Sequence, residues 1–449
     1  SSFSFLFLQK NFMKNRFLLA VLFFLVLLSN CQNKNIPSST ELKIVAKDFK
    51  EGFEKLNLSP NQLSYVVNLQ SIQSKDSILQ QETFFLKITK YLQNINPNKL
   101  SKKDRLDFEL MEYESKMNLL RITQEKTWSD LEIQDIPNTG LFSLPKGKNL
   151  YIYFLKRWIG LEVTPDEIYK FGLSEIERVK SRMKTVQTRA KMDSLTFRNY
   201  INNPSFYFED VEIVQEEFEK IKKIVAQKLP ENFPSLDLIS DVKIARGTNK
   251  ALAQVPAFYR NETFYYNFFD QPFNKRQISW IYIHEAMPGH HYQIMLENSL
   301  DRSDIQKMFQ YSGYREGWAA YIEEIGYEIG AYRDIFDELG KWEWDIIRSV
   351  RVAMDVGINY YGWSDEKALK FWKEHIQEQD DIGLREIARM KRWPCQVITY
   401  KYGADKILKW KTKSEKKKDF NLKQFHQTIL ENGSLPFSIL ENIIDNRKR

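Results

Sequence analysis

The chain is dominated by long segments in which apolar residues recur every three or four positions among charged ones. This period predicts amphipathic helices that each bury one face. Clear examples span residues 101–119, 165–183 and 342–356. Glycine and proline, which interrupt helices, are scarce, at 17 and 14 of 449 residues. The pattern therefore predicts a mainly α fold with a large buried core.

Few segments have strand character. Residues 242–245 form one, and an aromatic stretch over residues 257–268 forms the other. The middle of that stretch, Arg260-Asn261-Glu262, is typical of a turn, so the segment predicts a small β-hairpin. No linker or long-period repeat divides the rest of the chain. We therefore expect one large helical domain over residues 41–449.

The N-terminal residues differ from the rest in composition. Lys14 and Arg16 precede an apolar run over residues 17–28, which is shorter than the roughly 20 residues that cross a bilayer. The run is typical of a secretory signal peptide. It ends at Leu28-Ser29-Asn30-Cys31, which predicts a bacterial lipoprotein cleavage site with the lipid on Cys31. The alternative is a plain secretory signal with an incidental cysteine.

This segment divides into three parts. Residues 1–12 precede Met13, the first methionine, and are interpreted as an upstream mis-start. Residues 13–30 form the predicted signal peptide, and the polar residues 31–40 form a flexible tether. We therefore expect a protein of the bacterial cell envelope that is attached to a membrane through its N-terminal lipid.

Charge and cysteine content narrow the possible partners. The net charge of +7 over 449 residues is modest and basic residues are mixed with acidic ones, so no nucleic-acid partner is expected. The chain has only Cys31 and Cys395, and the first is expected to carry lipid. No intrachain disulfide is therefore predicted.

Three of the five histidines lie within one segment, His284-Glu285-Ala286-Met287-Pro288-Gly289-His290-His291. Imidazole is a common zinc ligand, and an adjacent carboxylate suits a general base. The order is similar to the zinc-peptidase motif His-Glu-x-x-His, but the next histidines follow His284 by six and seven residues instead of four. A kink at Pro288-Gly289 would return one of them to the metal. The alternative is a helix that ends at Met287, with the histidines flanking a turn.

A third ligand is expected on the amphipathic segment over residues 314–324. Glu316 adjoins Gly317 and Trp318, an unusual setting for a solvent-exposed acid, although a single glutamate on a helix most often faces solvent. Glu316 and Glu323 are seven residues apart and so lie on one face of a helix. In zinc peptidases with a glutamate ligand, that residue lies on a second helix at about this distance along the chain. Glu316 is therefore the candidate.

Several sequence blocks spread over about residues 40–410 form a wider pattern. With this pattern, the chain resembles the bacterial domain-of-unknown-function family 885, and the resemblance implies a relation to glutamate-ligand zinc peptidases such as the thermostable carboxypeptidases and angiotensin-converting enzyme. The blocks are Asp166-Glu167-Ile168 with Gly172-Leu173-Ser174-Glu175-Ile176, Ala257-Phe258-Tyr259 to Phe264-Tyr265-Tyr266-Asn267, His284-Glu285-x-x-Pro288-Gly289-His290-His291-x-Gln293, Glu316-Gly317-Trp318-Ala319, Arg348-x-x-Arg351 with Asp355-x-Gly357, and Pro394-x-Gln396 to Tyr400-Lys401-x-Gly403.

The resemblance implies a metallopeptidase-like helical domain with a zinc site. His284, His290 and Glu316 would bind Zn²⁺, with His291 in reserve, because the family motif closes at the position of His290. Glu285 would act as the general base. The hairpin would lie beside the active-site cleft, where its edge strand could pair with an extended peptide. An ordinary hairpin that covers the core is the alternative.

Three further residues are candidates for contact with the substrate. Tyr400 would donate a hydrogen bond to the oxyanion. Arg348 and Arg351 would clamp a substrate carboxylate, which favours short peptides or cleavage at C-termini. The alternative for both arginines is ion pairing within the core, for example with Asp345 or Asp355.

The chain departs from the family pattern at two positions. Gly357-Ile358-Asn359 stands where the family usually has histidine third, and Pro394-Cys395-Gln396 stands where it usually has glycine second. Asn359 stays a candidate for substrate binding, since an amide donates hydrogen bonds but carries no charge. Cys395 would place a thiol near the cleft.

These features together predict a lipid-anchored, zinc-dependent peptidase whose substrate is a peptide. One alternative is a catalytically weakened lipoprotein that uses the same fold as a binding module, which the two departures would favour. Another is a metal-dependent hydrolase of a non-peptide amide.

Overall fold

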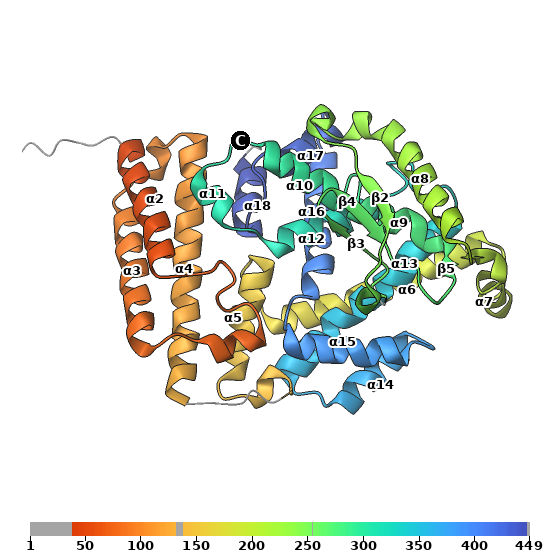
Figure 1. The fold of residues 1–449 in the computed structure, drawn as a ribbon, viewed down its shortest axis with the longest axis horizontal. Coiled ribbons are helices and arrows are strands. Elements are labelled where there is room, and N and C mark those ends of the chain that lie inside the picture. The colour runs from red at the N-terminus through yellow and green to blue at the C-terminus, as the bar shows by residue number, and fades with distance from the viewer. Residues whose placement is uncertain (1–37, 132–137, 254, 447–449) are drawn as a thin grey trace, which may run out of the picture.

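Helices form most of the computed structural model, which describes residues 38–131, 138–253 and 255–446 (Figure 1). The mainly α class predicted from the hydrophobic period is confirmed. The predicted signal peptide, Cys31 and the tether up to residue 37 lie outside the described residues. Within the described ranges, no helix combines the length and the apolar character that a membrane crossing requires.

Three helices at the N-terminal end form a layer of their own, coloured red to orange in Figure 1. They are joined by an aromatic cluster, in which the rings of Phe49 and Phe53 on the first helix lie 6.3 and 6.4 Å from the ring of Phe85 on the second. All three rings are buried, and burial of a side chain of this size contributes roughly 1.5–3 kcal/mol. The helices are α2 (Ser38–Lys55), α3 (Lys75–Gln93) and α4 (Lys102–Leu131), with η1 (Val66–Ser71) between the first two.

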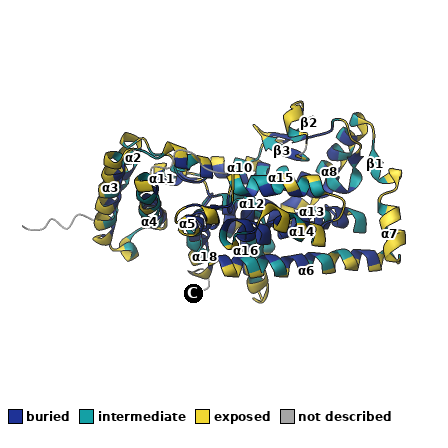
Figure 2. Cartoon of the chain, turned by 90° about the horizontal axis from the view of Figure 1, so that it is seen from below, coloured by how far each residue is buried: buried dark blue, intermediate teal, exposed yellow. Residues whose placement is uncertain are grey.

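Two long helices, α6 (Pro165–Arg189) and α13 (Ile335–Val356), pack along each other through the larger part of the molecule (Figures 1 and 2). Helix α6 begins with a capping box, in which Thr164 and Glu167 satisfy each other's backbone N–H groups. Helix α13 is buried along most of its length and continues into the π-helical turn η8 (Gly357–Tyr361). The helices predicted over residues 165–183 and 342–356 are parts of these two elements.

The remaining helices surround this pair. Figure 2 shows α12 and α16 in the buried interior and α7 exposed at one end. In chain order they are α5 (Gly147–Ile159), α7 (Ser194–Ile201), α8 (Val211–Asn232), α9 (Ile278–Glu285), α10 (His290–Ser299), α11 (Asp304–Met308), α12 (Ser312–Glu324), α14 (Asp365–His375), α15 (Asp380–Arg392), α16 (Ile398–Glu415), α17 (Leu422–Leu430) and α18 (Phe437–Asn446).

A three-stranded sheet lies beside α8 and α9, with the strand order β2-β4-β3. Strand β2 (Lys243–Arg246) is parallel to β4 (Thr263–Tyr266), and β3 (Ala257–Arg260) is antiparallel to it. Strands β3 and β4 are the predicted hairpin. Its two turn residues, Asn261 and Glu262, have φ values of 48° and 57°, as a tight two-residue hairpin turn requires. The short strands β1 (Tyr207–Phe208) and β5 (Phe273–Asn274) form a second, antiparallel pair.

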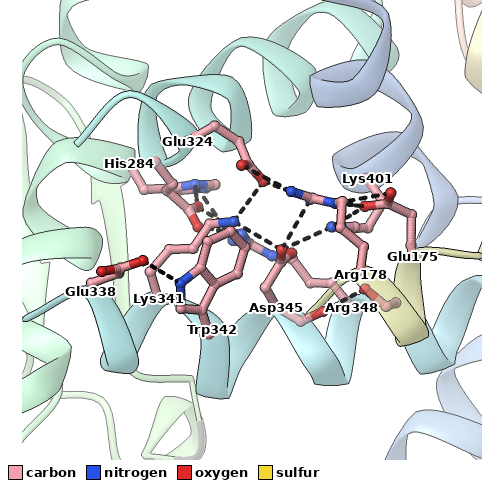
Figure 3. Close-up of polar contacts among 12 residues, drawn as sticks. Glu175, Arg178, His284, Glu324, Glu338, Lys341, Trp342, Asp345, Arg348 and Lys401 are labelled. Carbon is pink, nitrogen blue, oxygen red and sulfur yellow. Dashed lines mark hydrogen bonds and ion pairs between the residues drawn. The ribbon is translucent and has the colours of Figure 1, made fainter. Parts of the chain in front are cut away.

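A network of buried charges joins α6, α12, α13 and α16 (Figure 3). Lys341 Nζ lies 2.6 Å from the Glu324 carboxylate and 2.9 Å from that of Asp345, and Lys401 Nζ lies 2.8 Å from the same Asp345 oxygen. Burial disfavours the charged form of Glu324, but the Lys341 and Arg178 cations outweigh it and lower its pKa to about 2. Because removal of one member leaves a buried charge uncompensated, the network fixes the four helices relative to one another.

Helices α12 and α16 come closest at a pair of glycines. A Cβ atom added to Gly317 would lie 2.7 Å from the Cα atom of Gly403, and one added to Gly403 would lie 2.5 Å from the Cα atom of Gly317. Backbone atoms cannot turn aside as a flexible side chain can, so only glycine permits this approach. The contact sets the position of α12 and, with it, the position of Glu316.

Gly317→Ala is therefore expected to destabilise the protein. Alanine favours a helix interior by about 1 kcal/mol over glycine, but overpacking against a fixed backbone costs about 1–3 kcal/mol. We expect a net loss of up to about 2 kcal/mol in the free energy of unfolding, measured by urea denaturation. The control is Lys409→Ala on the exposed side of α16, which should change that energy little. A Gly317→Ala protein more stable than the wild type, as helix propensity alone would give, would contradict the close packing.

Candidate metal centre

The histidine segment folds as two helices separated by a sharp break. Helix α9 ends at Glu285, and α10 begins at His290. Between them, a Cβ atom on Gly289 would lie 1.9 Å from the carbonyl oxygen of His284, so no other residue fits at this position. The predicted kink is thus a complete interruption. The first helix ends two residues before Met287, where the alternative interpretation had placed its end. The break nevertheless brings His290 next to His284, and the centroids of the two imidazole rings lie 4.9 Å apart.

The break brings together the three residues predicted to bind metal. Glu316 Oε2 lies 3.4 Å from His290 Nε2 and 3.9 Å from His284 Nε2. One ligand atom from each residue lies within 4.8 Å of the other two. Four ligands at the roughly 2.0–2.2 Å typical of zinc lie about 3.3–3.6 Å apart in a tetrahedron. The donor set and its spacing therefore fit Zn²⁺ after a small contraction.

His291 points away from this centre. Its Nε2 atom lies 2.8 Å from the carbonyl oxygen of Ser240, and its Nδ1 atom lies 3.0 Å from the hydroxyl of Tyr259 on β3. Both ring nitrogens are thus engaged, one by the sheet and the other by the loop that precedes β2. The structure places His290 at the metal centre and gives the reserve candidate, His291, a structural position.

A buried carboxylate orients the first ligand, and the sequence did not reveal this role. Glu323 Oε1 lies 2.6 Å from His284 Nδ1, and Arg348 donates to both oxygens of Glu323 at 2.6 and 2.7 Å. A proton on Nδ1 that is donated to Glu323 leaves the Nε2 lone pair of His284 for a metal. The sequence signal was present, since Glu323 lies two helical turns after Glu316 on the same face of α12.

The electrostatics of the centre follow from burial and close opposite charges. Burial raises the pKa of Glu285, although the neighbouring His284 and His290 partly oppose this effect. Burial also disfavours the charged form of Glu316, but His290 and His284 outweigh it and lower the pKa of Glu316 to about 2. Glu316 is thus held as an anion, the form that binds a cation, while Glu285 is held closer to a proton-accepting range.

A cleft of about 1150 Å³ opens onto this centre and is lined by His284, Glu285, His290 and Glu316. The residues from Ala257 to Tyr259 of β3 form part of its wall, so the hairpin does lie beside the cleft, as expected. The side chains of Tyr400, Arg348 and Arg351 also line it. The guanidinium groups of Arg348 and Arg351 lie 5.3 and 5.6 Å from the ring centroid of Tyr400.

The two arginines are ion-paired, but not with the partners that the alternative named. Arg348 pairs with Glu323, and Arg351 donates to Glu386 at 3.0 Å. Asp345 belongs instead to the lysine network, and Asp355 accepts hydrogen bonds from Tyr151 and from the backbone of Cys395. Arg348 is therefore a positioning residue for the candidate metal centre, whereas Arg351 has a single anionic partner within the described part of the chain.

Asn359 was expected to contact substrate, and the structure corrects this expectation. The side chain is fully buried, accepts a hydrogen bond from Leu141 N–H and donates one to the carbonyl oxygen of Met390. It does not line the cleft. Cys395 is also fully buried outside the cleft, where burial and Asp355 raise the pKa of its thiol, so this thiol does not face the centre. Both departures from the family pattern are thus internal packing positions.

Comparison with known proteins places the chain among bacterial proteins without an assigned activity. A family model described as "Bacterial protein of unknown function (DUF885)" matches residues 126–444. No curated protein matches. A crystal structure of a "putative lipoprotein" from Colwellia psychrerythraea is similar with a TM-score of 0.63 and 22% identity, over 86% of this chain and 71% of that one. A "putative lipoprotein of unknown function" from Shewanella oneidensis has a TM-score of 0.55 and 20% identity, over 84% and 72%. These likenesses show the fold.

The two neighbouring histidines offer a matched pair for a test of the ligand set. His290→Ala should lose bound zinc, because it removes one of three ligands. His291→Ala should keep about one zinc per chain but lower the free energy of unfolding by about 1–2 kcal/mol, since it removes the hydrogen bonds to Tyr259 and Ser240. Zinc content is measured by elemental analysis after dialysis. Zinc retained by His290→Ala and lost by His291→Ala would contradict this ligand set.

Proposed function

The chain belongs to the family of bacterial proteins of unknown function DUF885, and from its candidate metal centre we propose that it is a zinc-dependent peptidase. The observation that carries this proposal is the convergence of His284, His290 and Glu316 at the end of a cleft, with Glu285 beside them. A site that only holds metal needs no additional acid. An acid next to an incompletely coordinated metal is the arrangement of a hydrolase.

Zinc, when bound by these ligands, supplies Lewis acidity toward the scissile carbonyl. Glu285 supplies the proton transfers: its carboxylate takes a proton from the attacking water and later passes it to the leaving amine. Its position supports this role, because it lines the cleft directly after His284 and burial raises its pKa toward the working range of a base. The proposal extends to the suggested relation with glutamate-ligand zinc peptidases.

Tyr400 is proposed to stabilise the oxyanion. Its hydroxyl accepts a hydrogen bond from Gln396 Nε2 at 3.3 Å, which leaves its own O–H as a donor toward the cleft. The flanking guanidinium groups of Arg348 and Arg351 add positive potential where negative charge develops. Preorganised donors of this kind act on the transition state more than on the substrate.

A peptide substrate is supported by strand β3. It is an edge of the sheet in the order β2-β4-β3, and among the described residues no further strand pairs with its outer edge. Because β3 also lines the cleft, an extended peptide could pair with it as an added strand and present a bond to the metal centre. The alternative of a non-peptide amide substrate has no corresponding feature.

We place the protein in the bacterial cell envelope, anchored by lipid on Cys31. The support is the signal-like segment before Cys31 and the description of two structural neighbours as putative lipoproteins. The alternative of a binding module that has lost activity rested on Asn359 and Cys395. Both lie outside the cleft, so they no longer favour it.

The Glu285→Gln variant tests the proposed enzymatic activity directly. Glutamine keeps the shape of the side chain but cannot accept a proton, so the variant should bind zinc and unfold like the wild type while hydrolysing peptides about 10²–10⁴-fold more slowly. Hydrolysis is measured across a diverse peptide library by mass spectrometry. Glu209→Gln, on the exposed surface, is the control and should be fully active.

Two results would contradict the proposal. Equal hydrolysis by Glu285→Gln and wild type would remove Glu285 as the base. If zinc-loaded wild type cleaved no peptide of the library, the binding module or another amide substrate would be favoured instead.

A further inference from the structure

The cleft carries far more positive than negative charge. Among the described residues, eight lysine and arginine side chains line it, against three acids, Glu285, Glu316 and Glu386. The first two acids belong to the candidate metal centre, where a metal would neutralise them. Two of the cations, Arg157 and Arg348, pair with Glu114 and Glu323 behind the wall. The other cations still outnumber Glu386, and an excess of this kind favours an anionic ligand.

Helix α15 supplies much of this charge. Arg385, Arg389 and Arg392 follow one another at spacings of four and three residues, so they lie on one face of the helix, and all three line the cleft. Arg385 and Arg392 form no salt bridge within the described part of the chain. Arg389 donates to Gln396 at 2.7 Å and lies 3.7 Å from Glu386.

Arg351 of α13 adds a buried cation to this face. Its side chain is 3% exposed, and its ionic partner among the described residues is Glu386, which Arg389 also approaches. The Nε atoms of Arg351 and Arg389 are buried and have no hydrogen-bond partner among the described residues. Burial lowers the pKa of Arg351, and the Glu386 anion does not fully offset it because Arg389 and Arg348 are close. The Glu386 carboxylate is thus shared by the guanidinium groups of Arg351 and Arg389, and the Nε–H groups of both arginines have no acceptor among the described residues.

This basic face is continuous with the metal centre. Arg351 and Arg348 both lie against the Tyr400 ring, and Arg348 holds the Glu323 carboxylate that orients His284. On the far side, the guanidinium groups of Arg389 and Arg392 lie 5.8 and 6.0 Å from the ring of Trp393, which also lines the cleft. A chemical group bound on this face could therefore belong to the same substrate molecule as a scissile bond held at the candidate metal centre.

We propose that Arg351, Arg385, Arg389 and Arg392 form a subsite for a carboxylate of the substrate, so that the peptidase acts on peptides with an anionic group near the scissile bond. This inference rests on the proposed function for its substrate class, but the binding of a carboxylate can be measured without hydrolysis. Guanidinium groups match carboxylates through paired N–H donors, which is why arginine and not lysine is suited to this face. The carboxylate can come from the C-terminus or from an acidic side chain.

The test measures binding of four tetrapeptides to the zinc-loaded Glu285→Gln protein by fluorescence anisotropy, each peptide with a neutral fluorophore at its N-terminus. Ala-Ala-Ala-Glu as free acid has both carboxylates, and its C-terminal amide has only the side-chain one. Ala-Ala-Ala-Gln as free acid has only the terminal one, and its amide has none. Charge-assisted hydrogen bonds are strong enough that a peptide with the recognised carboxylate should bind at least about tenfold more tightly.

The pattern identifies the source of the carboxylate. Tighter binding of both free acids assigns the C-terminus, and tighter binding of both glutamate peptides assigns the side chain. Adding Arg389→Gln, or Arg385→Gln as an exposed position that cannot disturb the core, should reduce the preference several-fold. Lys391→Gln on the same helix, which does not line the cleft, should preserve it. Equal binding of all four peptides, or a preference unchanged by both arginine variants, would overturn the subsite.

The proposed peptidase activity and the proposed carboxylate subsite can each be refuted without the other. A carboxylate preference in binding, without hydrolysis of any peptide by the wild-type protein, would refute the peptidase and leave the subsite. Hydrolysis of all four peptides at equal kcat/KM, with equal binding, would refute the subsite and leave the peptidase.

Discussion

The fully buried carboxylate of Glu323 is the interaction on which the rest of the candidate site depends. It binds His284 on α9 and Arg348 on α13, and it is carried by α12, so one side chain joins three helices. Removing Arg348 would leave this buried carboxylate without its counter-ion, which costs about 3–5 kcal/mol. Because Glu316 lies two turns earlier on the same helix, the position of α12 decides both the orientation of His284 and the location of Glu316.

The surrounding packing serves this arrangement. The Gly317 and Gly403 contact lets α12 approach α16 more closely than any side chain would allow, and the lysine network behind it holds α12 against α6 and α13. On the other side, Trp318 Nε1 donates to the carbonyl oxygen of Pro288 at 2.9 Å and so ties α12 to the break between α9 and α10. That break replaces the single helix of the His-Glu-x-x-His motif and explains how a spacing of six residues can still place two imidazoles together.

The structural features that could be predicted from the sequence are those that depend on residues close together in the chain. The helical periods, the 257–268 hairpin and its turn are local patterns, and the structure contains them all. The set of His284, His290 and Glu316 was implied by family resemblance, and the structure brings the three together. Arg348 could not be assigned from sequence, because its partner Glu323 lies 25 residues away on another helix. The prediction for Asn359 failed for a similar reason. Asn359 follows Arg348 by eleven residues, about 16 Å along the helical axis, and at that point η3 (Leu141–Ser143) and α15 cover its side chain.

The central claim is that His284, His290 and Glu316 form a zinc site with an open fourth position. Zinc K-edge X-ray absorption of the purified protein tests it most directly. The account predicts two imidazole ligands and light oxygen ligands at about 2.0–2.2 Å, with both imidazole contributions retained in His291→Ala. A spectrum with no imidazole ligands, or one that includes a sulfur ligand at about 2.3 Å, would contradict it.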